Sequence, residues 1–169
     1  KLFEVRATPL CSPALLEGRH PLLKPDDLRH HVLLHDDTLT AEEGGADWDA
    51  WLAAAGVEGL DTRRGPHFNQ ASVGLEAAAD GAGVMLTYPV LAASELARGR
   101  LVAPFDLSLP VAAAYYAITR TPEPPAMVIA FRDWALDSGT VFGFKEGTTS
   151  ALEVPAAERN ARYEKAWQK

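Results

Sequence analysis

The chain has 169 residues, of which 47% are hydrophobic and 23% are charged, proportions typical of a globular protein with a packed core. The formal net charge is −7 and the 16 Lys and Arg residues are scattered, which excludes a nucleic-acid-binding face built from these residues alone. The single cysteine, Cys11, excludes an internal disulfide and fits a reducing compartment, and no apolar run approaches the roughly 20 residues needed to cross a bilayer.

The first part of the chain alternates apolar segments with helix-start signals. The segment from Lys1 has neither an initiator Met nor the layout of a signal peptide, so we expect the chain to be a fragment that begins inside a strand. The predicted elements are a strand at Leu2–Leu10, a short helix at Ser12–Gly18 with Ser12 as its cap, a helix start at Pro25–Leu28, a buried strand at Val32–His35 and a polar loop at Asp36–Asp47.

The alternation continues through the middle of the chain. The predicted elements are a helix at Trp48–Ala55 closed by Gly56, an extended segment at Leu60–Phe68, a helix at Asn69–Asp80, a strand at Gly83–Thr87, a helix at Pro89–Arg98, strands at Leu101–Val102 and Ala112–Thr119, and a helix at Pro125–Asp137. Strands that alternate with helices at short intervals predict an α/β fold with a mainly parallel sheet.

A series of short motifs then points to a family. The motifs are Thr8–Leu16, Leu33–Asp36 followed by Trp48 and Trp51, Leu75–Val84, Leu96–Phe105 and Ala130–Trp134. In this order and spacing the chain, from about Leu2 to Leu136, resembles the effector-binding domain of LysR-type transcriptional regulators, and among them the glycine-cleavage-activator subgroup.

The resemblance implies a two-lobed fold like that of type II periplasmic binding proteins, with the second lobe complete and the first lobe partial. Residues 1–8 would be a crossover strand from the truncated first lobe, and residues 9–112 the second lobe. Residues 113–139 would hold the return strand and the last helix of the first lobe, and residues 140–169 a terminal tail. The winged helix-turn-helix and the front of the first lobe would be missing.

The best candidate for a binding site is the segment that enters the helix at Asn69–Asp80. Free N–H groups and the helix dipole at such an entry favour a carboxylate or similar anion. By resemblance, this position lines the effector cleft, which assigns effector binding to Phe68, Asn69 and Gln70, with Ser72 as a weaker member. The alternative is that Asn69 only caps the helix and Phe68 only packs in the core.

Two further candidates follow predicted strands. One is the polar loop His35-Asp36-Asp37-Thr38, from which His35 and Thr38 are assigned to the effector site. The other is Thr87 and Tyr88, after the next strand. Loops at strand ends often carry sites, and the alternative for both is a solvated loop.

Other chemistries are weaker readings of this sequence. Adjacent histidines such as His30 and His31 cannot easily face one ion from a strand, and no pattern completes a zinc site, so we expect no metal. Cys11 has no base placed by spacing, so we expect no nucleophile. Trp48 and Trp51 are expected to pack in the core rather than stack on a cofactor. Arg63–Arg64 is expected to be a solvated strand edge.

The predicted function is therefore ligand sensing within a cytoplasmic, DNA-binding regulator, with no catalysis and no cofactor. The implied partners are a small-molecule effector, either a carboxylate or an amino acid, further copies of the protein in a dimer or tetramer, and DNA through the missing domain only. A membrane partner is not expected. The alternatives are a transport-type solute-binding protein with the same fold, which would need an export signal, and an enzyme, which would need converging catalytic groups.

Overall fold

The computed structural model of the chain describes residues 3–40, 46–116, 118 and 124–141. Its strands are β1 (Phe3–Leu10), β2 (Leu33–Asp36), β3 (His67–Phe68), β4 (Val84–Thr87) and β5 (Leu109–Tyr115). Its α-helices are α1 (Asp37–Thr40), α2 (Trp48–Ala55), α3 (Ala71–Ala79), α4 (Ala93–Ala97) and α5 (Ala126–Val141), and its 3-10 helices are η1 (Pro13–Leu16), η2 (Pro25–His30) and η3 (Pro89–Ala92).

The strands form one mixed sheet in the order β3-β2-β4-β1-β5. Strand β2 runs parallel to β3 and β4, whereas β1 runs antiparallel to both β4 and β5. The α/β class is confirmed, but the expectation of a mainly parallel sheet is wrong. Hydrophobic pattern shows which segments are buried strands, and it carries no information on the direction of their neighbours.

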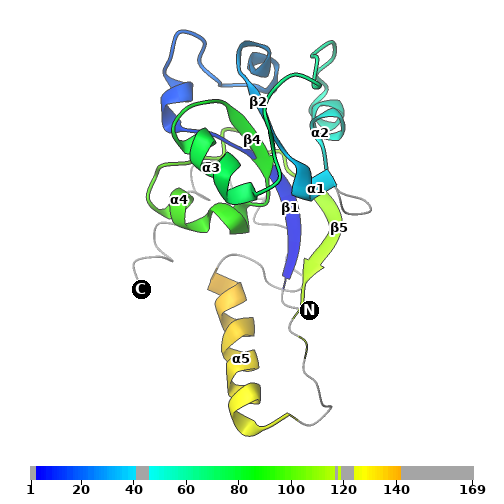
Figure 1. Ribbon diagram of the computed structural model, residues 1–169, viewed down its shortest axis with the longest axis vertical. Helices are drawn as coiled ribbons and strands as arrows, with labels where there is room; N and C mark the ends of the chain where they lie inside the picture. Colours follow the sequence, from blue (N-terminus) through cyan, green and yellow to red (C-terminus); the bar gives the residue numbers. More distant parts are fainter. Residues whose placement is uncertain (1–2, 41–45, 117, 119–123, 142–169) are drawn as a thin grey trace.

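Helices cover both faces of this sheet, with α3 and α4 on one side and α2 on the other (Figure 1). Successive strand residues point to opposite faces, so Leu33 belongs to the α2-side core and Leu34 to the α3-side core. Trp48 and Trp51 are 2% and 0% exposed, and each indole N–H donates to a backbone carbonyl. The core-packing interpretation of the two tryptophans is confirmed.

The helix prediction at Trp48–Ala55 is confirmed at both ends. Asp47 caps α2 by accepting a hydrogen bond from the backbone N–H of Ala50 at 2.8 Å. Gly56 ends the helix with φ of 71°, in the left-handed region that glycine adopts at little cost. Ser12 occupies the predicted N-cap position of η1, but its side chain makes no capping hydrogen bond to the first turn.

Three predicted segments differ from the structure. The expected loop at Asp36–Asp47 starts inside β2 and continues as α1, because Asp36 still belongs to the strand. The expected strand at Leu101–Val102 is reduced to an isolated bridge between Val102 and Cys11. The strand predicted at Ala112–Thr119 is β5, which begins three residues earlier, and the predicted end at Thr119 lies outside the described residues.

Smaller differences concern where elements begin and end. The extended segment predicted at Leu60–Phe68 forms strand only at β3, with the turn at Thr62–Arg63 before it. The helix predicted at Pro89–Arg98 is η3 followed by α4. The predicted tail at 140–169 falls almost wholly outside the described residues.

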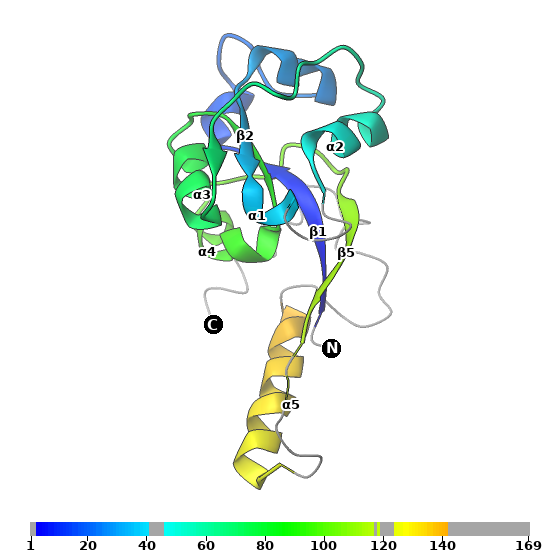
Figure 2. The same cartoon turned by 45° about the vertical axis from the view of Figure 1, so that its right-hand side comes forward.

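Helix α5 projects from the end of the molecule where the free end of β1 lies (Figure 2). It was predicted as Pro125–Asp137 and extends to Val141. Two of its large apolar side chains, Phe131 and Trp134, are 64% and 62% exposed and contact each other with ring centroids 5.5 Å apart. None of the described helices is both long and apolar enough to cross a membrane.

Burial makes Cys11 a structural residue. Its side chain is 0% exposed, and the desolvation raises the pKa of its thiol to about 12. A raised pKa keeps the thiol protonated at every pH below that value, and only the thiolate reacts readily. We therefore expect iodoacetamide at pH 8 to leave Cys11 unmodified in the folded chain and to modify it in urea, as read by mass spectrometry. Equal labelling in both conditions would show that the thiol is accessible.

Candidate effector site

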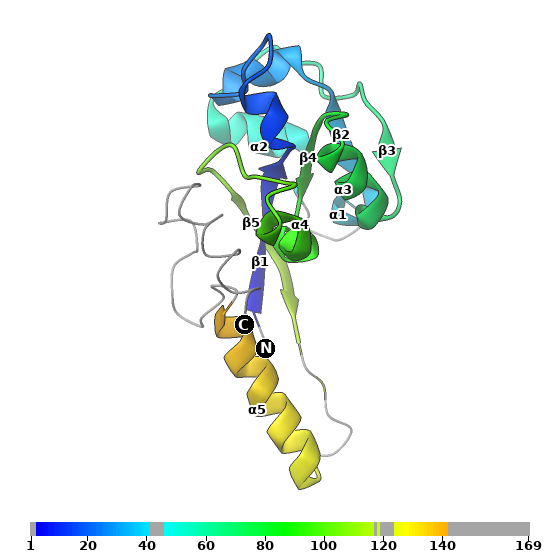
Figure 3. The same ribbon diagram turned by 90° about the vertical axis from the view of Figure 1, so that its left-hand side faces the viewer.

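The carboxyl ends of β2, β3 and β4 lie at one edge of the sheet because these strands are parallel. In Figures 2 and 3 this edge, marked by α1 and α4 where the chain leaves β2 and β4, is on the side of the lobe toward α5. Ligands of open α/β sheets bind outside the carboxyl ends of the strands. The edge is therefore the first place to look for a site.

A polar row crosses the sheet at this edge, on the face covered by α3. Thr8 pairs with Thr87, and Asp36 pairs with Phe68. Two residues further into the sheet, the buried apolar residues Leu10, Met85 and Leu34 occupy the equivalent positions on the same face. The change from apolar to polar thus coincides with the strand ends, as in a binding site above a packed core.

Asp36 is the centre of this row. Its side chain is 4% exposed, and its two carboxylate oxygens have different partners. Oδ1 accepts from the backbone N–H of Thr38 at 3.1 Å and from the Thr38 hydroxyl at 2.5 Å, and Oδ2 accepts from the Thr87 hydroxyl at 2.9 Å. The carboxylate therefore joins the turn after β2 to the end of β4.

The main predicted site, at the entry of α3, is partly exposed. Asn69, Gln70 and Ser72 are exposed, whereas Phe68 is half-buried against the α3-side core. Gln70, not Asn69, occupies the N-cap position, and the Gln70 side chain makes no capping hydrogen bond. The capping interpretation of Asn69 is therefore wrong, while the packing interpretation of Phe68 is supported.

A close contact fixes α3 against the sheet at this entry. A Cβ atom at Gly74 would lie 2.6 Å from the Met85 Cε atom and 3.1 Å from Phe68 Cδ2, so a larger residue here would require these side chains to move. The contact holds the first turn of α3 beside the carboxyl ends of β3 and β4. The exposed side chains at the helix entry are thus carried on a rigid element.

The two secondary candidates behave differently. Thr38 and Thr87 are brought together through Asp36, although Thr87 is 0% exposed and acts through its hydrogen bond. Tyr88 is 7% exposed and occupies the N-cap position of η3, where its side chain makes no capping hydrogen bond. His35 is not part of this group, because residues next to each other in a strand face opposite sides of the sheet.

His35 instead stacks on His67, its partner on β3, with ring centroids 4.2 Å apart and planes 7° from parallel. His67 Nδ1 lies 2.8 Å from an Asp37 carboxylate oxygen. The two rings join β3 to β2 on the face opposite Asp36. In the described part of the chain, no three His, Cys, Asp or Glu side chains converge as metal ligands would.

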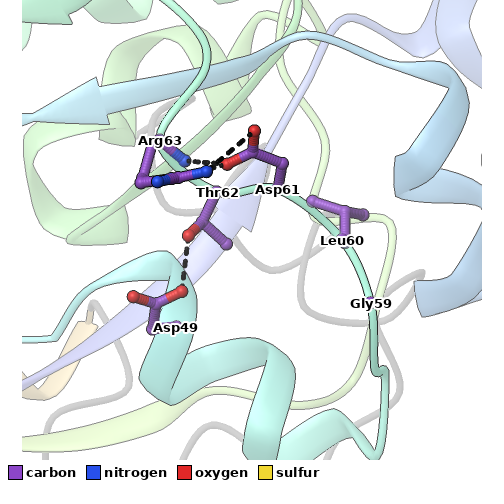
Figure 4. A pocket seen from close by; sticks show the side chains of 6 residues that line it. All are labelled: Asp49, Gly59, Leu60, Asp61, Thr62 and Arg63. Atoms are coloured by element: carbon purple, nitrogen blue, oxygen red, sulfur yellow. Dashed lines mark hydrogen bonds and ion pairs between the residues drawn. The ribbon is translucent and has the colours of Figure 1, made fainter.

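A shallow depression elsewhere on the surface competes with this edge as a binding site (Figure 4). Its volume is about 410 Å³, and it is lined by Asp49, Gly59, Leu60, Asp61, Thr62 and Arg63. The Thr62 hydroxyl donates to Asp49, and the hydrogen bond from Arg63 lowers the pKa of the Asp61 carboxyl. Arg63 and Arg64 are both 87% exposed and both contact Asp61, so the charges here are already paired. They lie in a turn and not at the strand edge that was expected.

The fold is that of an effector-binding domain of the type II periplasmic-binding-protein class, and sequence comparison gives the family. Residues 1–140 match the LysR substrate binding domain. The chain belongs to this family.

Its relatives are transcriptional regulators. The chain is 36% identical over 137 residues to the glycine cleavage system transcriptional activator of Escherichia coli strain K12, and this alignment covers 80% of the chain and 43% of the activator. It is 35% identical over 133 residues to the transcriptional activator AmpR of Citrobacter koseri, covering 79% of the chain and 43% of AmpR. The chain thus spans less than half the length of these relatives.

Solved structures agree on the fold. The effector domain of AmpR from Pseudomonas aeruginosa superposes with a TM-score of 0.60 at 28% identity, covering 83% of this chain and 64% of that domain. The AmpR effector-binding domain from Citrobacter freundii superposes with a TM-score of 0.61 at 26% identity. This superposition covers 82% of this chain and 66% of that domain. The predicted family and fold class are confirmed, and the alternative of a transport protein finds no support among these relatives.

Proposed function

We propose that this chain is the effector-sensing part of a LysR-type transcriptional regulator, and that a small molecule binds at the carboxyl edge of β2, β3 and β4. The observation that carries the proposal is the convergence of the polar row with the entry of α3. There, exposed Asn69 and Gln70 adjoin the first turn of a helix, whose free N–H groups favour an anionic group.

The proposed domain organisation follows the sequence prediction. Residues 1–8 and 113–139 would belong to the first lobe and its crossovers, and residues 9–112 to the second lobe. The antiparallel pairing of β1 with β5 supports this, because two crossover strands between the same lobes must run in opposite directions. Ligand held between the lobes would favour one lobe arrangement and so shift the population of regulator conformations.

The partners and setting are proposed from the relatives. Because the relatives are transcriptional activators, we propose an oligomeric, cytoplasmic regulator that contacts DNA through a domain outside this chain. We also propose that the chain binds its effector without transforming it. The described side chains at the strand ends support this, since the Asp36 carboxylate is held by the Thr38 and Thr87 hydroxyls.

The test is a titration of amino acids and small carboxylates into the full-length protein, followed by the variants Asn69→Ala and Gln70→Ala. Each variant should weaken binding by about twofold to tenfold, the loss expected for one or two hydrogen bonds. Thr62→Ala, in the competing depression of Figure 4, is the matched control and should leave affinity unchanged. Loss of affinity in the control with none in the two variants would move the site to that depression.

A further inference from the structure

Asp36 lies in the candidate loop His35–Thr38 and is hydrogen-bonded to two of the predicted effector-site residues, Thr38 and Thr87. A carboxylate that is 4% exposed has lost most of its hydration, so its charge is weakly screened. Such a charge normally sits beside a cation. Among the described residues, no Lys, Arg or His forms an ion pair with Asp36.

A cation on the same face of the sheet, Arg6, bonds elsewhere. Arg6 lies on β1, two residues before Thr8, and its guanidinium donates to the backbone carbonyl of Ser108 at 2.9 Å. Burial lowers the pKa of Arg6, and the negative charge of Glu4 acts in the opposite direction and raises it. Asp36 does not contribute to this pKa shift. The polar row therefore carries a net negative charge.

The hydrogen bonds of Asp36 also leave room for a further donor. An ionised carboxylate offers about four lone-pair positions. Thr38 fills two of them at Oδ1 and Thr87 fills one at Oδ2. One acceptor position on Oδ2 remains, at the strand ends where the proposed ligand binds.

Across the sheet, Asp36 lies beside the chain segment that leads into α3. Asp36 pairs with Phe68, and Gln70, which begins α3, is two residues further along the chain. The edge thus offers a negative group beside a helix entry that favours negative groups. A ligand with charges of both signs would interact favourably with both groups.

We propose that Asp36 is a binding residue of this site and selects an effector that carries a protonated amine beside its acidic group. The inference rests on the proposed function, and it narrows the effector from carboxylates in general to amino-acid-like zwitterions. Thr38 and Thr87 then orient the carboxylate and need not touch the ligand.

The test compares three probes on the full-length protein, namely glycine, acetate and methylamine, by calorimetry or ligand-detected NMR. The key variant is Asp36→Asn, which removes the charge and keeps groups that can bond to both threonines. Asp26→Asn is the charge-matched control, because Asp26 lies on η2 with a 55% exposed side chain paired to Arg29. Thermal unfolding of each variant reports on the fold.

The wild-type protein should bind glycine at least about tenfold more tightly than acetate. Asp36→Asn should reduce that preference to about threefold or less, because it weakens the binding of glycine and leaves the binding of acetate unchanged or stronger. Asp26→Asn should keep the wild-type preference. A purely structural role would weaken all probes together and lower the melting temperature, and that result would overturn the inference. So would an unchanged preference in Asp36→Asn. A wild-type protein that binds none of the probes or of the wider ligand panel would contradict the proposed function as well.

Discussion

Trp51→Ala is expected to destabilise the lobe by about 3–5 kcal/mol, the cost of removing a fully buried large aromatic side chain. Trp51 is 0% exposed, and its ring packs on Phe105 and Trp48 with centroids 5.4 and 5.9 Å away. Its indole N–H donates to the carbonyl of Leu107 at 3.3 Å. The substitution therefore opens a cavity between α2 and the sheet and leaves a part-buried carbonyl without its donor.

Urea unfolding followed by circular dichroism measures the loss, and the chain offers a matched control. Trp134→Ala removes the same side chain from α5, where it is 62% exposed, and should cost less than about 1 kcal/mol. Similar losses in the two variants would mean that Trp51 is not the centre of the α2-side core.

Gly65→Ala is expected to cost at least about 3 kcal/mol or to displace β3 from the sheet. The φ angle of Gly65 is 132°, a conformation that residues with a Cβ rarely adopt. An added Cβ would lie 1.9 Å from the carbonyl oxygen of Leu33, which is backbone and cannot rotate away. Because β3 has only two paired residues, a shift at Gly65 moves the segment that leads into α3.

Gly99→Ala is the control that separates the cost of a steric clash from the cost of a positive φ angle. Gly99 also has a positive φ, of 69°, but nothing lies within 4 Å of an added Cβ. Its replacement should cost about 1 kcal/mol. Hydrogen exchange at His67 and Phe68 should accelerate in Gly65→Ala and stay unchanged in Gly99→Ala. Equal unfolding free energies for the two variants would contradict the close approach at Leu33.

The sequence predicted the elements with strong periodicity and clear ends. The helix at Trp48–Ala55 was predicted from the helical spacing of its apolar residues and from Gly56, a local C-terminal signal that no distant contact overrides. The family motifs predicted the fold class. Strand direction was not predictable, since β1 and β4 are far apart in the chain and pair antiparallel through contacts that no local pattern encodes.

The candidate site was predicted only in part, for a related reason. The sequence placed Thr38 and Thr87 after successive strands and so indicated the correct edge of the sheet. It grouped His35 with Thr38 and Thr87. Because successive strand residues point to opposite faces of the sheet, His35 lies on the face opposite Asp36. The sequence indicated Asp36 only as part of the candidate loop His35–Thr38 and assigned it no contact of its own, because its burial depends on register with β4.

Hydrogen–deuterium exchange of the full-length protein, with and without the tightest-binding member of the amino acid and carboxylate panel, tests the central claim most directly. The proposal predicts that ligand protects peptides covering Thr38, residues 68–72 and Thr87–Tyr88. Protection that falls instead on residues 59–63, around the depression in Figure 4, with no change at the carboxyl ends of β2, β3 and β4, would contradict it.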